Sequence, residues 1–221
     1  MNIIESMTTR HACRSYLNRP VEQLLIEKIL DAARFAPSGV NTQPWQVVVV
    51  QGKTQQQLAE QIINAKENNQ PANPDYAYYP DQWHEPYKSR RKDCGLALYT
   101  ALDIQRSDIE KQKQAWNNNY RFFNAPVGLL FFIDKQLSQG SWIDMGMFLQ
   151  NIMLAAKEYG LSTCPQAALA EYPDIIRNLL TIDEQYAVVC GMALGYEDES
   201  HPTNQYRLQR ESVDSFTRWF E

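Results

Sequence analysis

Four arginines lie near the two ends of the chain, beside short polar segments. "TTRHACR" places Arg10 and Arg14 four residues apart, and "NQYRLQRES" contains Arg207 and Arg210. Residues four apart on a helical turn share a face, so Arg10 and Arg14 could direct both guanidinium groups at one ligand. Such a pair suits a phosphate or a conjugated carbonyl, to which arginine donates parallel hydrogen bonds. Taken alone, each pair is also typical of a solvated surface.

A second unusual segment is "APSGVNTQPWQVVVV", residues 36–50, a polar turn directly before a run of valines. Proline and glycine shape such a turn, while serine and asparagine supply hydrogen-bonding groups. This is a rich mixture for the entrance to one strand. The turn residues with candidate binding roles are Pro37, Ser38, Gly39 and Asn41.

Several common chemistries lack their motifs in this sequence. It contains no GxGxxG, GxxxxGK[ST], GxSxG or HExxH pattern, which excludes dinucleotide-fold, P-loop, hydrolase-elbow and zincin interpretations. The four cysteines are widely spaced without a CxxC pair, so we expect reduced thiols and no metal site. His11 stands alone beside a basic residue and is more typical of a structural than a catalytic histidine. We therefore assign no catalytic residue.

The composition is that of an ordinary globular protein. The chain has 221 residues, of which 44% are hydrophobic and 21% charged, with a formal net charge of -5. This balance predicts one domain over residues 1–221 and no nucleic-acid or membrane partner. We expect a cytoplasmic location, because no apolar run approaches the roughly 18 residues of a membrane-spanning helix and no signal-peptide pattern begins the sequence.

Hydrophobic periodicity predicts an α+β fold. Helices are expected over about 21–35, 54–69, 88–102 and 106–118. The run "QVVVV" predicts a strand inside a covered sheet, and "APVGLLFFID" predicts a second buried strand. Further along, "LSTCPQAAL", "YPDIIRNLL" and "YAVVCGMALGY" predict a short strand, a helix and a third strand.

The segment "SWID" has the form of a capping box, which predicts that a helix begins at Ser141. The apolar stripe of this helix consists of Met145, Phe148, Leu149, Ile152, Met153 and Ala156.

Two regions fall outside this regular pattern. Residues 70–87 are rich in proline and aromatic residues, which predicts a long surface excursion. A polar C-terminal extension begins at about residue 197 and ends in the amphipathic "VDSFTRWF". Since this extension has little partner surface of its own, we expect it to dock on another element or another subunit.

Four blocks in this order resemble the nitroreductase family of FMN-dependent enzymes: "RHACR", "AARFAPSGVNTQPW", "GLSTCPQAAL" and "GMALGYEDESHPTNQYRLQRE". They span nearly the whole chain. The segments "YYPDQWHEPYKSRR", "GSWIDMGMFLQN" and "TCPQAA" are similar to the nitrobenzoate-reductase-type members in particular. The resemblance implies a nitroreductase-like fold, in which helices flank a mixed, mainly antiparallel sheet. It also implies an intertwined homodimer with each FMN between the subunits.

The resemblance also implies site residues. Arg10, His11 and Ala12 match the segment at the FMN phosphate and ribityl chain, and Arg14 matches the basic residue facing N1 and the C2 carbonyl. Many relatives have serine at the place of Ala12, so one side-chain hydrogen bond to phosphate is absent there. A second group matches the turn that reaches FMN from the partner subunit: Pro37, Ser38, Gly39 and Asn41. A third group matches the stretch that runs past flavin N5: Pro165, Gln166, Ala167 and Ala168. Arg210 matches a late phosphate-binding residue, with Arg207 as a second candidate.

The activity implied is an NAD(P)H-dependent nitroreductase, which passes two electrons from NADH or NADPH to a nitroaromatic or quinone by a ping-pong mechanism. Alternatives on this fold are reductive dehalogenation, flavin fragmentation, and flavin binding without turnover. The aromatic residues at 76–87 could form a lid over the flavin or only a surface loop. Arg90 and Arg91 could attract a substrate carboxylate or simply be solvated.

Overall fold

The apolar runs of the sequence form an antiparallel sheet in the computed structural model, which describes residues 2–221. Its strands are β1 (Gln46–Gln51), β2 (Val127–Asp134), β3 (Ser162–Gln166) and β4 (Tyr186–Gly195). Within the described residues the strand order is β1-β2-β4-β3, and all three pairings are antiparallel. The α+β prediction is confirmed, with strands in the expected places.

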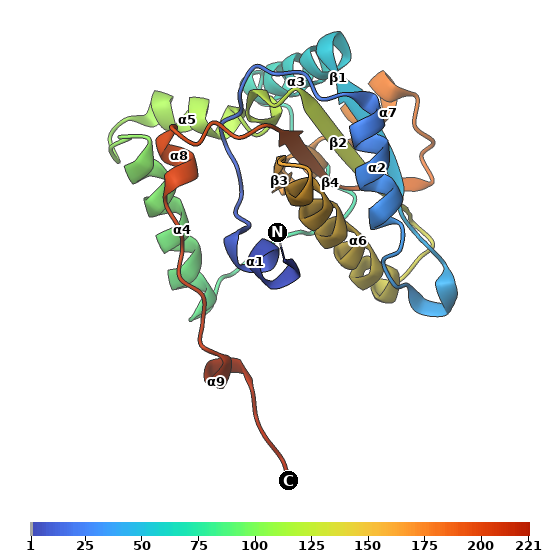
Figure 1. Ribbon diagram of the computed structural model, residues 1–221. Coiled ribbons are helices and arrows are strands. Elements are labelled where there is room, and N and C mark those ends of the chain that lie inside the picture. Colours follow the sequence, from blue (N-terminus) through green and yellow to red (C-terminus); the bar gives the residue numbers. More distant parts are fainter. Residues whose placement is uncertain (1) are drawn as a thin grey trace.

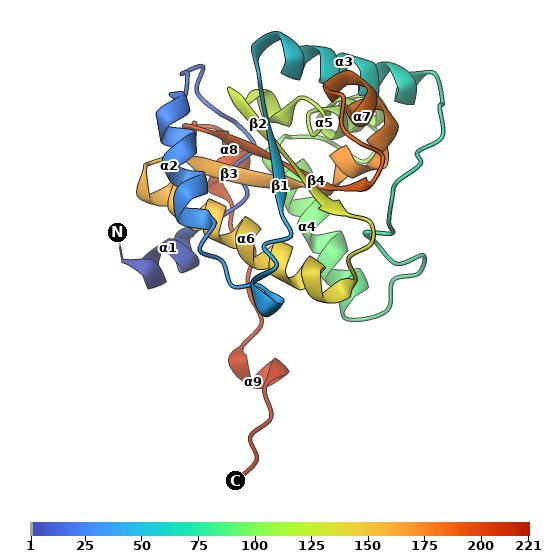
Figure 2. The ribbon, with the colours of Figure 1, turned by 90° about the vertical axis from the view of Figure 1, so that its right-hand side faces the viewer.

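Both faces of the central strand β2 are covered. Leu129, Phe131 and Ile133 belong to one buried cluster, while Leu130 and Phe132 belong to another. This division follows from the period of a strand, in which successive side chains point to opposite faces. Figure 2 shows α2 (Gln23–Ala33) and α6 (Gln139–Glu158) on one side of the sheet, with α3 (Gly52–Glu67) and α7 (Pro173–Leu180) on the other.

The valine run of β1 lies at an edge of the sheet, so its predicted place inside a covered sheet is wrong. β1 pairs with β2 along one side and has no other strand partner among residues 2–221. Val50 is buried, but Val49 is 40% exposed. A continuous apolar run indicates a strand, but it does not distinguish a central strand from an edge that another surface could cover.

The remaining elements lie outside these two layers. They are α1 (Ile3–Thr9), α4 (Tyr87–Ala101), α5 (Ile109–Asn117), α8 (Pro202–Gln205) and α9 (Val213–Phe216), with short turns η1 (Gly39–Asn41), η2 (Phe122–Asn124) and η3 (Ala167–Glu171). None of residues 87–101 in α4 is buried. The tail that carries α9 extends away from the body of the protein (Figure 1).

The predicted capping box is wrong, although the predicted stripe of α6 is confirmed. The helix begins at Gln139 after Ser138, so Ser141 lies inside its first turn. Of the stripe residues, Met145, Phe148, Ile152 and Ala156 are buried, and the other two pack against the same cluster. The spacing of Ser141 and Asp144 matched a cap by coincidence, since Asp144 Oδ2 instead accepts a hydrogen bond from the Gly39 N–H at 3.1 Å.

One buried carboxylate ties the excursion at 70–87 to the sheet. Asp75 accepts two hydrogen bonds from Arg177, at 2.7 and 3.2 Å, and one from the Val188 N–H at 2.9 Å. Lys135 Nζ lies 3.1 Å from the same carboxylate, and Tyr76 donates its hydroxyl to the Val189 carbonyl at 2.5 Å. The excursion therefore begins at a fixed point on β4.

We expect Asp75→Asn to destabilise the protein by about 2 to 3 kcal/mol at pH 7, because it leaves the buried Arg177 without its main counter-charge. Burial acts to raise the pKa of Asp75, but the hydrogen bonds from Arg177, Val188 and Lys135 outweigh it and lower the pKa. Because the pKa of Asp75 is lower in the folded protein than in the unfolded chain, its carboxylate stabilises the fold at any pH above the unfolded-state pKa. This contribution is lost as the pH falls below about 4.

Urea unfolding of both proteins at several pH values measures this difference. The gap between them should narrow steadily below about pH 4. Asp174→Asn is the control, because Asp174 contacts Arg177 with a side chain that is 58% exposed, and its loss should cost less than about 1 kcal/mol. A gap that stays constant down to pH 2 would contradict the electrostatic explanation.

Candidate functional site

A pocket of about 740 Å³ lies where the N-terminal segment meets the residues after α8. Two parts of the chain, almost 200 residues apart, supply its walls. Its lining includes six of the residues predicted from sequence, namely Arg10, His11, Ala12, Arg14, Arg207 and Arg210. The structure therefore brings the two arginine pairs to one cavity.

The buried amide of Asn204 joins these two segments. Its Oδ1 accepts a hydrogen bond from the Arg14 N–H at 2.8 Å, and its Nδ2 donates to the carbonyls of Ser15 and Asp198 at 2.8 and 2.9 Å. Only 2% of Asn204 is exposed. Because three polar partners converge on one buried amide, Asn204 sets the position of the N-terminal segment against α8.

The pocket concentrates positive charge. Burial, and then the neighbouring Arg210 guanidinium, lower the pKa of Arg10. Arg14 donates from Nη1 to the Tyr206 hydroxyl at 3.0 Å, and Arg207 and Arg210 donate to backbone carbonyls. Within residues 2–221, none of these four arginines forms an ion pair with a carboxylate. Guanidinium groups gathered in this way create a site for an anion.

His11 lines the pocket but directs Nε2 at a carboxylate of the protein. Nε2 lies 2.7 Å from Glu197 Oε1, and Ser162 donates its hydroxyl to Glu197 Oε2, also at 2.7 Å. Burial acts to raise the pKa of Glu197, but the hydrogen bonds from His11 and Ser162 outweigh it and lower the pKa. This geometry agrees with the prediction of a structural histidine.

The thiols near the site are protonated and therefore weak nucleophiles. Burial raises the pKa of Cys164 to about 11 and of Cys13 to about 12, so both are protonated at neutral pH. All four cysteines are free. Across residues 2–221, the structure contains no group of three or more His, Cys, Asp or Glu side chains that could hold a metal ion.

The turn with Pro37, Ser38, Gly39 and Asn41 does not reach this pocket. Figure 1 shows it on the other side of α6 from α1. Its backbone is strained, because Val40 and Asn41 have φ values of 45° and 61°. Asp144 holds it through the Gly39 N–H, while Val40 is 98% exposed. In one chain, the turn therefore faces outward.

The segment Pro165, Gln166, Ala167 and Ala168 ends β3 and does not line the pocket either. The Gln166 side chain is 2% exposed and donates to the Asn119 carbonyl at 2.6 Å, so it points into the protein. Ala168 is also buried. Of the four residues, Pro165 is exposed and Ala167 is partly exposed, so a ligand could reach these two residues and the backbone of the stretch.

Sequence reasoning did not single out Asn204, Tyr206 or Glu197. All three lie inside the quoted block "GMALGYEDESHPTNQYRLQRE", but an isolated asparagine, tyrosine or glutamate carries no pattern in a sequence. A second hollow of about 580 Å³ lies beside α3, where Arg121 is the single arginine among its lining residues. It has no comparable concentration of positive charge.

The fold and this pocket define the class of protein. The nitroreductase family model matches residues 7–196, and the chain belongs to that family. In the described part of the chain, helices are too short or too polar to cross a membrane.

Within this family, the chain is similar over most of its length to reductases of nitroaromatic compounds. The chain is 39% identical to a 4-nitrobenzoate reductase of Pseudomonas putida, across 96% of this chain and 93% of the relative. It is also 39% identical to a nitrobenzene nitroreductase of Ectopseudomonas oleovorans, across 94% and 92%.

Solved structures agree with these relatives. An FMN and NADPH-dependent nitroreductase NfnB from Sphigopyxis sp. strain HMH superimposes with a TM-score of 0.95 at 34% identity, covering 100% of both chains. The FMN-dependent nitroreductase NfnB from Mycobacterium smegmatis, in complex with NADPH, gives 0.93 at 30% identity, covering 99% of this chain and 97% of that chain.

We expect Asn204→Leu to lower the free energy of unfolding by about 2 to 3 kcal/mol, because it leaves the Arg14 N–H without its partner and removes one donor each from the Ser15 and Asp198 carbonyls. Urea denaturation measures the change. Gln205→Leu is the control, because the exposed neighbouring amide makes longer bonds, at 3.4 and 3.2 Å, and its loss should cost less than about 1 kcal/mol. Equal losses in the two variants would show that Asn204 has no special structural role.

Proposed function

We propose that this protein is an FMN-dependent oxidoreductase that passes two electrons from NADH or NADPH to a nitroaromatic or quinone acceptor. One observation carries the proposal: four arginines without carboxylate partners line a single pocket, at the positions that the family resemblance assigns to FMN. Nitro compounds appear in the names of relatives at 36 to 39% identity, which favours this reaction over dehalogenation or flavin fragmentation.

The residues of the pocket fit FMN. A phosphate monoester carries a charge near -2 at neutral pH, and Arg10, Arg207 and Arg210 offer the positive charge to balance it. An anion between Arg10 and Arg210 would also relieve the repulsion between their guanidinium groups, which after burial is the second cause of the lowered pKa of Arg10. The volume of about 740 Å³ lies within the range of about 300 to 1,000 Å³ typical of ligand sites.

Each part of the site has a distinct proposed role. Arg10, His11, Ala12 and Arg210 hold the phosphate and ribityl end, with Arg207 beside them. Arg14 faces N1, where its positive charge stabilises an anionic ring. The backbone of residues 165–168 runs past N5. Bound FMN would take up two electrons from the reduced nicotinamide and deliver them to the acceptor. Donor and acceptor would use the same site in turn, which is the ping-pong order.

We also propose a homodimer in which each chain completes the other's FMN site. The turn with Pro37, Ser38, Gly39 and Asn41 lies away from the pocket of its own chain and exposes Val40. In the tail, Phe216, Trp219 and Phe220 are 71%, 81% and 90% exposed. A partner chain would cover these apolar groups and receive the turn. We regard residues 1–221 as one domain, and the free thiols suit a cytoplasmic location.

Mixed dimers test whether the turn acts on the partner. An Arg10→Met chain damages its own pocket, whereas a Ser38→Ala/Asn41→Ala chain damages the partner's site. Each variant homodimer should bind FMN at least about ten-fold more weakly than the wild type. A mixed dimer isolated with two different tags should regain one FMN of near-normal affinity, because one of its two sites is then assembled entirely from intact segments. If the turn served its own chain, neither site would be intact and the affinity would stay low.

Two single variants separate the proposed roles of the arginines. Arg14→Met should retain FMN but lower the two-electron potential by roughly 40 mV, which corresponds to about 2 kcal/mol lost from the reduced state. Arg210→Met should weaken FMN binding about ten-fold or more and leave the potential of the remaining holoenzyme nearly unchanged. Arg106→Met, at an exposed arginine outside the pocket, is the control for charge alone. Loss of FMN in Arg14→Met with an unchanged potential would show that the roles are assigned wrongly.

A further inference from the structure

Arg90 and Arg91 are adjacent on α4 but have different environments. Arg90 Nε forms an ion pair with Glu211 Oε1 at 3.0 Å, so its charge is already engaged by the tail. Arg91 is exposed, and within residues 2–221 it has neither an ion pair nor a hydrogen-bond partner. Its guanidinium carbon lies 5.3 Å from the ring centroid of Trp83. Arg91 is thus an uncompensated cation placed over an aromatic ring.

Trp83 is the last member of a row of aromatic rings, which we call the aromatic row. Its neighbouring ring centroids are separated by 4.5, 6.2, 4.6 and 5.6 Å. Tyr78 and Tyr79 in the middle of the row are 56% and 55% exposed, so a planar ligand can reach their rings. In order, the members are Trp142, Tyr76, Tyr78, Tyr79 and Trp83.

The row is fixed at one end and charged at the other. Tyr76, the second member of the row, donates to the Val189 carbonyl, and the preceding Asp75 is held by Arg177, so this part of the row is anchored to the sheet. Trp83, at the opposite end, lies under Arg91. An aromatic surface that ends in a free guanidinium matches the chemistry of an aromatic carboxylate, whose ring can stack while its two oxygens accept parallel N–H donors.

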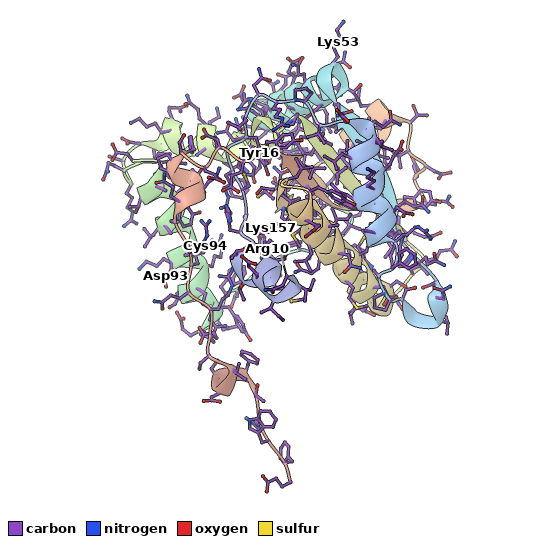
Figure 3. All side chains as sticks on the ribbon, in the orientation of Figure 1. Arg10, Tyr16, Lys53, Asp93, Cys94 and Lys157 are labelled. Atoms are coloured by element: carbon purple, nitrogen blue, oxygen red, sulfur yellow. The ribbon has the colours of Figure 1, made fainter. Side chains whose placement is uncertain are left out.

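The charged end of the row lies toward the proposed FMN pocket. Arg91 precedes Cys94 by three residues on α4, about 4.5 Å along the helix axis and on nearly the same face. Figure 3 shows Cys94 on the side of α4 that faces Arg10, with Asp93 on the opposite side.

We propose that Arg91 and the aromatic row form an acceptor subsite for aromatic carboxylates, so that nitroaromatic acids are preferred over neutral nitroaromatics. This inference rests on the proposed function and specifies its substrate class. Arg91 supplies the charge that recognises the carboxylate, and the rings of the row supply the stacking surface. Arg90 does not contribute, because Glu211 already neutralises it.

The test compares the holoenzymes of the wild type, Arg91→Gln and Lys92→Gln. Lys92→Gln is the matched control, because it also removes one positive charge. Lys92 is the next residue, about 100° around the helix, and it has no ion pair within residues 2–221. Each protein is assayed with 4-nitrobenzoate and with nitrobenzene at saturating NADPH. In Arg91→Gln, KM for 4-nitrobenzoate should rise about ten-fold, while the kinetics with nitrobenzene stay within about two-fold.

A binding measurement without turnover provides a second readout. Benzoate titrated into the oxidised holoenzyme should bind about ten-fold more weakly in Arg91→Gln than in Lys92→Gln, which should match the wild type. Arg91→Lys keeps the charge but loses the two parallel donors, so its affinity should fall between those of the wild type and Arg91→Gln.

Three results would overturn the inference. In the first, Arg91→Gln changes both substrates equally or leaves the preference for 4-nitrobenzoate intact. In the second, Lys92→Gln produces the same loss, which would reveal a general effect of net charge. Both leave the proposed function standing. In the third, wild-type holoenzyme reduces neither compound, and the proposed function then fails together with the inference.

Discussion

The hydrogen bonds of Asn204 are the constraint on which the candidate site depends. The arginines belong to segments at opposite ends of the chain, and nothing in their own chemistry draws like charges together. The buried amide of Asn204 has all its hydrogen-bond partners only when the backbone of Arg14, Ser15 and Asp198 surrounds it. These hydrogen bonds offset part of the repulsion between the arginines. The protein can then hold a concentration of positive charge ready for an anionic ligand.

The same principle operates at two other places in the structure. Asp75 fixes the start of the aromatic excursion against β4, and Asp144 fixes the turn at Gly39 against α6. In each case a carboxylate with little exposure to water needs hydrogen-bond donors, and one of its donors is a backbone N–H. Three loops that a sheet cannot order by itself are thus held at defined positions by one polar side chain each.

This arrangement explains how a rigid centre can serve a site built from loops. The sheet is packed on both faces through alternate residues of β2, which leaves little freedom in its position. The functional segments lie outside it, where α4 buries none of its residues 87–101 and the tail extends away from the body. Exposed segments of this kind can adapt to a second chain or to a substrate while their anchors stay in place.

The sequence by itself determined the elements, since hydrophobic periodicity records which side of an element is apolar. It predicted the stripe of α6, the buried strand that ends at Asp134 and the helix at "YPDIIRNLL", and it singled out four arginines that the structure brings to one pocket. It could not reveal the neighbours of a strand, so the valines of β1, which were predicted inside a covered sheet, lie at the edge of the sheet.

Only the tertiary structure decided which polar residues act together. The apparent cap at Ser141 and Asp144 was a local coincidence, whereas the real partner of Asp144 is 105 residues away in the chain. Arg90 and Arg91 are indistinguishable as neighbours in a sequence, and a glutamate of the tail neutralises just one of them. Partners distant in the chain leave no local pattern, because hydrogen bonds and ion pairs depend on distances in space that only the folded chain defines.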